Sequence, residues 1–122
     1  MTKYIGNDIY CDKIIPFHND GDAEIVVVAE TANVLAFQHT RPTWPVHIVV
    51  TPKFHIASLL TLTDEPGLAQ ELLEVIKEVS KKVLEEHGAS RVLTNLGDYQ
   101  DSKHLHFHIS SGKPLQTTHS TV

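Results

Sequence analysis

The chain has 122 residues, 41% hydrophobic and 20% charged, which is the size and composition of one soluble globular domain. Ten Lys and Arg against fifteen Asp and Glu leave a net charge of −5 with histidine neutral, so broad nucleic-acid binding is not expected. No apolar run approaches the roughly 18–20 residues of a membrane span, and no signal-peptide stretch is seen. The single cysteine, Cys11, cannot form an internal disulfide, so we expect a cytoplasmic protein without a membrane partner.

Three segments in the first half of the chain have the composition of strands. Residues 24–29 are rich in β-branched side chains, and residues 34–37 follow closely enough to complete a hairpin. Residues 46–51 are again β-branched and lie between Pro45 and Pro52, which bound the strand at both ends.

One long helix is predicted over residues 65–87, because its apolar side chains recur every three or four residues and form one stripe. Pro66 suits its first turn and Gly88 its C-terminal cap. A fourth strand is predicted at 91–94, before a turn around Gly97.

No internal repeat or linker interrupts the sequence, so we predict one domain over residues 1–122. Its core covers about residues 8–115, and the polar, threonine-rich tail of 116–122 lies outside that core. One long helix against antiparallel strands is an α+β layer architecture.

The most distinctive segment among the nine histidines is His104-Leu105-His106-Phe107-His108-Ile109. In a strand, side chains two residues apart share a face and lie ~6.5–7 Å apart, so three imidazoles would line one face while three apolar side chains enter the core. Such a row can combine a nucleophile, a proton donor and an anion-binding group, and neutral imidazole attacks phosphorus to form a covalent intermediate. Histidine is also a common zinc ligand, so this segment alone leaves metal binding open.

Together with this motif, other blocks of the sequence resemble the histidine-triad (HIT) family. The family's signature is three histidines alternating with hydrophobic residues, and 104–109 matches it, with Ser110 in place of the usual next apolar residue. Residues 42–56 resemble the block in which a histidine precedes an apolar strand ending in Pro-Lys-x-His, and 8–15 resemble the N-terminal segment. The Ser-Ser-Gly-Lys run at 110–113 places the resemblance closest to the Hint-like branch of purine nucleotide phosphoramidases.

The resemblance implies a five-stranded antiparallel sheet with one long helix, and a homodimer that joins two such sheets into one. It implies binding of purine nucleoside monophosphates and hydrolysis of the bond between AMP and a leaving group, typically an amine. It implies no cofactor and no metal.

The resemblance also assigns roles residue by residue. His106 would be the nucleophile that attacks the α-phosphorus, and His108 would bind a phosphate oxygen. His47 would lie behind His106 and fix its tautomer by a hydrogen bond, with His104 supporting the network. The implied nucleotide-binding group is Asn95, Gln100, Asp101 and Ser102 beside the phosphate, and Ile9, Tyr10 and Phe37 around the base. Without the family, those last three would be interpreted as plain core.

Three departures from the family pattern bear on activity. His39 stands where close relatives carry an acid for the ribose hydroxyls, and a neutral imidazole has only one acceptor nitrogen. Asp101 stands where Ser is frequent, and a carboxylate ~4 Å from a phosphate oxygen would repel it by roughly 4 kcal/mol at an effective dielectric near 20. It would therefore turn away, act as a protonated general acid, or slow catalysis. Bulky Trp44 replaces a small residue, and the loop 97–100 is about two residues shorter.

Three hypotheses therefore stay open: a nucleotidyl hydrolase acting through His106, a nucleotide-binding protein with little or no catalysis, and a zinc-binding histidine site. Some relatives place zinc on a cysteine pair and two histidines, and one cysteine of that pair is Asp8 here. Because carboxylate also binds zinc, a zinc group remains a candidate, made of Asp8, Cys11, His55 and His104.

Overall fold

The computed structural model describes residues 25–115, which form one sheet and its helices. The strands are β1 (Val27–Glu30), β2 (Val34–Gln38), β3 (Val46–Pro52), β4 (Arg91–Leu93) and β5 (Phe107–Ser111). The helices are α2 (Leu59–Leu62), α3 (Pro66–His87) and the short 3-10 helix η2 (Gly97–Tyr99). The strands lie in the order β1-β2-β3-β5-β4 and all neighbours are antiparallel, so the predicted five-stranded α+β fold is confirmed.

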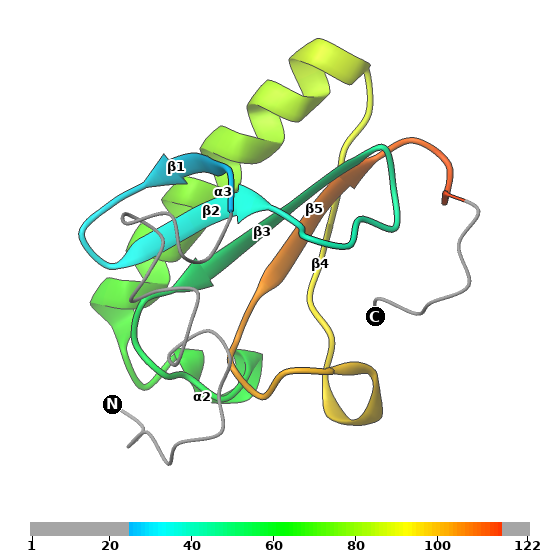
Figure 1. Cartoon of the computed structure of the whole chain (residues 1–122). Helices are drawn as coiled ribbons and strands as arrows, with labels where there is room; N and C mark the ends of the chain where they lie inside the picture. The colour runs from blue at the N-terminus through cyan, green and yellow to red at the C-terminus, as the bar shows by residue number, and fades with distance from the viewer. Residues whose placement is uncertain (1–24, 116–122) are drawn as a thin grey trace.

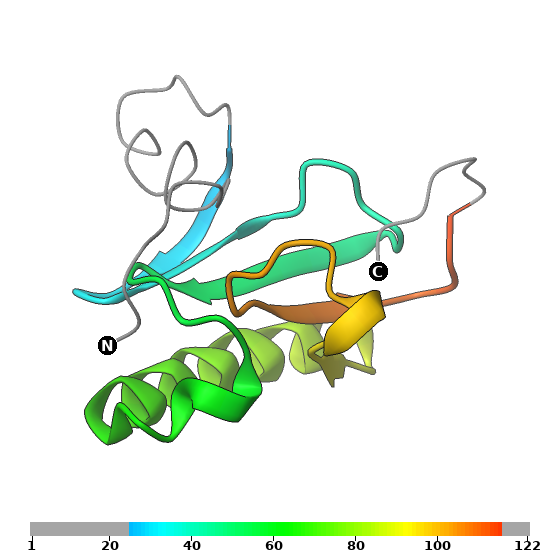
Figure 2. The ribbon, with the colours of Figure 1, turned by 90° about the horizontal axis from the view of Figure 1, so that it is seen from below.

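Helix α3 covers one face of the sheet (Figure 1), and Figure 2 shows the two as separate layers. Its first residue is Pro66, where a missing N–H leaves no hydrogen bond unmade, and Gly88 ends it with a φ of 79° that favours glycine. The helix predicted over 65–87 is thus confirmed to within one residue. Its buried stripe packs on the sheet and consists of Leu68, Leu72, Val75, Ile76, Val79 and Val83. Within 25–115, no helix has the length and apolar character needed to cross a membrane.

One carboxylate fastens the β1–β2 hairpin to α3. The hairpin turn is closed by a hydrogen bond of 2.9 Å from the Thr31 N–H to the Val34 carbonyl. The Glu71 carboxylate accepts from the backbone N–H and the side-chain amide of Asn33, both at 2.9 Å, and from the Thr31 hydroxyl. These hydrogen bonds, the one from Thr31 first, lower the pKa of Glu71 because they favour its charged form.

Strand boundaries differ from the prediction most at the histidine segment. The strand predicted over 104–109 begins only at Phe107 and continues to Ser111. Before β5, the Leu105 N–H donates to the Ile56 carbonyl at 2.6 Å. The chain there is hydrogen-bonded to the segment after β3 and is not paired in the sheet. The first strand also lies slightly later than predicted, and β4 ends one residue earlier.

Candidate functional site

The histidines of interest lie where β3 and β5 pair, at the centre of the sheet. Along both strands, alternate residues belong to the core under α3, and the residues between them face the other way. His47 and Val49 of β3 and His108 of β5 belong to this second set, with Val49 paired to His108 and His47 paired to Ser110. The predicted alternation is confirmed, because the apolar partners of the three histidines all lie under α3: Leu105, Phe107 and Ile109.

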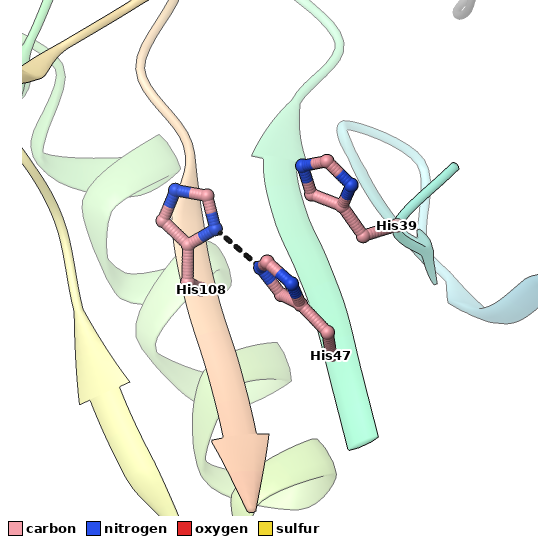
Figure 3. A group of neighbouring side chains, drawn as sticks. All are labelled: His39, His47 and His108. Atoms are coloured by element: carbon pink, nitrogen blue, oxygen red, sulfur yellow. Dashed lines mark hydrogen bonds between the residues drawn. The ribbon is translucent and has the colours of Figure 1, made fainter. Parts of the chain in front are cut away.

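A directed chain of hydrogen bonds runs through His47 and His108. The Thr43 backbone N–H donates to Nδ1 of His47 at 3.0 Å, so the proton of that imidazole must be on Nε2. This Nε2 is 2.8 Å from Nδ1 of His108 (Figure 3), so His47 donates and His108 accepts. The proton of His108 is therefore on its own Nε2, at the far end of the chain.

Both imidazoles are held neutral by their surroundings. Burial, reinforced by the neighbouring imidazoles of His39 and His106, lowers the pKa of His47 to about 4. Burial, with the same kind of neighbours, lowers the pKa of His108 to about 3. At neutral pH, His108 thus presents a neutral N–H whose direction is fixed by Thr43 and His47.

That N–H is an unused donor in the described part of the chain. Nε2 of His108 is buried and meets no hydrogen-bond acceptor among residues 25–115. A buried polar group without a partner costs about 1–3 kcal/mol, and proteins retain few of them. An acceptor oxygen on a ligand would satisfy this donor.

His106 is oriented by the backbone. Its Nδ1 is 2.7 Å from the His104 carbonyl, which can only accept, so Nδ1 carries the proton and Nε2 carries the lone pair. Its ring lies 5.0 Å from that of His108, at an angle of 75°. The local backbone is fixed by two hydroxyls at 2.8 Å, from Thr94 to the His106 carbonyl and from Thr51 to the Leu105 carbonyl.

The predicted hydrogen bond from His47 to His106 is wrong. His47 donates to His108, and the backbone carbonyl of His104 fixes the tautomer of His106. The register explains the difference, because His47 pairs with Ser110. His108 is then its diagonal neighbour, two residues along, whereas His106 is four residues along and beyond direct reach.

His104 supports the turn before β5 instead of joining this chain. It is fully buried, and its Nε2–H donates to the Pro52 carbonyl at the end of β3, at 2.8 Å. Its ring lies 5.6 Å from that of His55, which keeps these two members of the candidate zinc group together. Asp8 and Cys11, the other two members, lie outside the described residues.

The predicted phosphate-side residues differ in how they are used. Asn95 is partly buried, and its Nδ2 meets no acceptor within 25–115, so it is a second unused donor. The Gln100 side chain is already committed to the Ala57 carbonyl at 2.8 Å, which makes its role structural. Asp101 is exposed and Ser102 is half-buried.

The predicted base-side residues are only partly described. Phe37 is buried in a small apolar cluster with Leu35 and Val49, on the same face as His108. Ile9 and Tyr10 lie outside the described residues, so their contact with a base stays a prediction.

His39 joins the histidine network by stacking on it. Its ring lies 4.3 Å from that of His47, at an angle of 25°, and its Nδ1 accepts from the Arg41 backbone N–H at 2.9 Å. One nitrogen from each of His39, His47 and His108 lies within 4.8 Å of the others, a spacing that a metal ion could use (Figure 3).

The hydrogen bonds around these imidazoles do not suit a metal. A ligating imidazole normally donates its second N–H to an acceptor, but Nδ1 of both His39 and His47 faces a backbone N–H donor. If Nε2 bound a metal ion, the proton of each imidazole would have to be on Nδ1. Two N–H donors, the one on Nδ1 and the one on the backbone, would then face each other. The arrangement therefore favours a hydrogen-bonded network over a metal centre.

Sequence reasoning missed Thr43 and Thr94, which orient His47 and His106. Thr43 acts through its backbone N–H, which every residue except proline has, so its side chain gave no signal. Thr94 is the last residue of the strand predicted over 91–94, and that prediction gives no role to its hydroxyl, which donates to the His106 carbonyl.

A five-stranded sheet covered by one helix, with a directed imidazole lone pair beside a directed imidazole N–H, defines a protein of the histidine-triad class. The HIT domain family matches residues 20–115, so the chain belongs to the HIT family. It is 40% identical over 91 residues to the adenosine 5'-monophosphoramidase hnt1 of Schizosaccharomyces pombe, a match that covers 73% of this chain and 65% of that protein.

Solved structures show the same fold. A histidine triad protein from Clostridium difficile superposes with a TM-score of 0.72 at 32% identity, covering 96% of this chain and 100% of that one. A HIT family hydrolase from Legionella pneumophila gives a TM-score of 0.72 at 29% identity, covering 88% and 94%.

Proposed function

We propose that the protein hydrolyses the bond between a purine nucleoside monophosphate, AMP in particular, and an amine leaving group, through a covalent nucleotidyl intermediate on His106. The observation that carries the proposal is the placement of protons: His106 has its lone pair on Nε2, beside the Nε2–H of neutral His108. The names of two relatives, an adenosine 5'-monophosphoramidase and a HIT family hydrolase, support the same chemistry.

In the first step, Nε2 of His106 attacks the α-phosphorus. The nitrogen–phosphorus bond to His106 forms while the bond from phosphorus to the amine breaks, and the departing amine takes up a proton from solvent. The substituted imidazole is then cationic. The His104 carbonyl, which accepts its Nδ1–H, stabilises that charge without any rearrangement.

His108 acts on the phosphate oxygens during this step. Its Nε2–H donates to a non-bridging oxygen, and the amide of Asn95 supplies a second donor. The backbone at Asp101 and Ser102 completes the phosphate contacts. Because the Asp101 side chain is exposed, solvent weakens the repulsion that its carboxylate would exert on the phosphate.

In the second step, water attacks the same phosphorus and the bond to His106 breaks. AMP leaves, the water's extra proton passes to solvent, and His106 returns to the neutral tautomer fixed by His104. No step needs a metal ion, because imidazole and amide groups supply both the nucleophile and the oxygen donors.

We also propose that two copies pair through β4. Within the described chain, this strand is bonded only to β5 and forms an edge of the sheet, and Val92 on it is 48% exposed. Leu84 of α3 is another large apolar side chain left exposed. Joining two β4 edges would satisfy backbone groups and cover apolar surface. A monomer seen by light scattering at working concentration would contradict this.

The reaction is tested with an AMP phosphoramidate, with and without EDTA, by following AMP release. We expect release that resists the chelator and disappears in His106→Ala, whose folding is checked by circular dichroism. AMP binding without release by the wild-type protein would instead favour a nucleotide-binding protein with no useful catalysis. Release that stops with EDTA would favour a metal-dependent site.

A further inference from the structure

Trp44 contacts the histidine network at His47, the residue whose ring also stacks on His39. The His47 ring contacts both side chains: the His39 ring lies 4.3 Å away and nearly parallel, and the Trp44 ring lies 5.0 Å away, edge-on at 69°. Contacts with two aromatic rings restrict how far the His47 ring can rotate. The direction of the Nε2–H bond to His108 depends on that rotation.

Arg91 in turn holds Trp44. Its guanidinium carbon lies 5.3 Å from the Trp44 ring centroid, in the geometry of a cation–π contact. The register places Arg91 opposite Ser110, and Ser110 opposite His47, so the three lie in one row across β4, β5 and β3. The guanidinium donates to the Ser110 hydroxyl at 3.1 Å and to the Gly112 carbonyl, which fixes it in this row.

The loop that carries Trp44 is fastened to the segment after β5. The Leu115 N–H donates to the Thr43 carbonyl at 2.6 Å. Gly112 has a φ of 94°, and a Cβ there would lie 2.9 Å from the ring of Pro45, so only glycine allows this close approach. The same loop supplies the Thr43 N–H that fixes the tautomer of His47.

We infer that Trp44, held by Arg91, is a positioning residue that keeps the His47 ring aligned on His108. The inference rests on the proposed function, and it adds residues that do not touch the reacting atoms. It also explains together three features of the sequence: a bulky residue at position 44, a hydroxyl at Ser110, and a glycine at 112. Each is needed for the same row of contacts.

Steady-state kinetics on an AMP phosphoramidate give the first test. We expect Trp44→Ala to lower kcat roughly three- to tenfold, and Arg91→Ala roughly two- to fivefold, with KM changed less than about twofold in both. Trp44→Phe keeps an aromatic edge against His47 and should restore most of kcat. Lys77→Ala, an exposed cation on α3, is the control for loss of one charge.

A readout independent of activity is the tautomeric state of His47 and His108, measured by two-bond ¹H–¹⁵N NMR correlation. In the wild type and in Trp44→Phe, we expect both imidazoles to be locked with the proton on Nε2 at pH 7. In Trp44→Ala, the His47–His108 pair should show averaged nitrogen shifts. The effect of Arg91→Ala should lie in the same direction.

The possible outcomes separate this inference from the proposed function. The wild type could fail to cleave the phosphoramidate while Trp44→Ala shows averaged tautomers of His47 and His108. That result would support the inference and refute the proposed reaction. Locked tautomers and unchanged kcat in Trp44→Ala would overturn the inference and leave the reaction intact. A raised KM with unchanged kcat would also overturn it, because Trp44 would then be a substrate contact. If Trp44→Ala does not fold, the same measurements on Arg91→Ala and Arg91→Lys, substitutions at an exposed position, test whether Trp44 positions His47.

Discussion

The two faces of the sheet differ in how completely their side chains satisfy one another. The face under α3 is a continuous cluster of buried apolar residues. The opposite face has a small apolar cluster of Leu35, Phe37 and Val49, and beside it a network of buried histidines. One end of that network, the Nε2–H of His108, has no acceptor among residues 25–115.

The difference suggests separate tasks for the two faces. Apolar contacts under α3 are complete in the absence of any ligand, so that face stabilises the fold. The histidine face has a buried donor, the Nε2–H of His108, without an acceptor among residues 25–115, and an acceptor oxygen of a ligand would offset its cost of about 1–3 kcal/mol. Substitutions on the two faces should therefore change different observables.

Among the substitutions that compare the two faces, the largest effect is expected from His108→Ala. It removes the donor aimed at the phosphate, and loss of one such donor typically lowers kcat about 10²- to 10³-fold. The free energy of unfolding should change little, because the substitution removes one unsatisfied buried N–H but leaves the His47 Nε2–H without its acceptor. Kinetics on an AMP phosphoramidate and urea unfolding check both halves. A variant that unfolds easily but keeps kcat would reverse the assignment of the faces.

On the other face, Leu72→Ala should affect stability and spare catalysis. Leu72 is fully buried under the sheet, and its truncation is expected to lower the free energy of unfolding by about 2–5 kcal/mol. The adjacent Leu73, largely exposed on the same helix, is the matched control, and Leu73→Ala should cost less than about 1 kcal/mol. Equal losses in the two variants would contradict the packing of α3 described above.

Acid should weaken the histidine face. The pKa of His47 is lowered to about 4 and that of His108 to about 3, from a usual value of 6.5 in the unfolded chain. The unfolded state therefore takes up protons at a higher pH than the folded state does. The contribution of each histidine to the free energy of unfolding is fully present above pH 6.5 and is lost as the pH falls toward 4. At pH 4.5 the loss should be on the order of 2 kcal/mol per histidine.

Urea unfolding between pH 7.5 and 4.5 measures this loss, and His47→Gln should reduce its slope. His87→Ala, at the exposed end of α3, is the control, because that side chain is outside the network. The same slope in the wild type and in His47→Gln would show that the network does not titrate as described.

The smallest effect is expected where the hairpin meets the helix. Glu71→Gln keeps the size of the side chain but removes the charge that Thr31 and Asn33 stabilise, so we expect a loss of about 0.5–1.5 kcal/mol at pH 7. The pKa of Glu71 is lowered in the fold, so this contribution should vanish as pH falls through that lowered pKa. Urea unfolding of both proteins at pH 7 and pH 3 measures it, and an undiminished difference at pH 3 would contradict the account.

The sequence was sufficient to predict the fold, because the signals are local and periodic. The apolar stripe of α3 and the alternation of histidine and apolar residues around His106 are both found in the structure. Pro66 and Gly88 mark the ends of the helix as expected. The boundaries of β5 were less predictable. The turn before β5 is hydrogen-bonded to the Ile56 carbonyl, so the strand begins later than predicted. Nothing in the sequence around β5 indicates that hydrogen bond.

The grouping of His47, His106 and His108 was predictable from the sequence, but the hydrogen bonds among them were not. Which histidine receives the bond from His47 depends on the register of β3 with β5, a long-range property that one sequence does not reveal. The tautomers depend on backbone groups at Thr43 and His104, which carry no side-chain signature. Trp44 departs from the family pattern in the sequence, but its contact with Arg91 depends on the pairing of β4 with β5.

The most direct test of the central claim is to trap the intermediate. The protein is mixed with an AMP phosphoramidate, quenched within milliseconds, digested and analysed by mass spectrometry. We expect one adenylyl group, located on His106 by fragmentation of its peptide, in the wild type and in His47→Gln, and none in His106→Ala. Turnover with no adenylylated peptide at any quench time, or with the group on His108, would contradict the assignment of His106 as nucleophile.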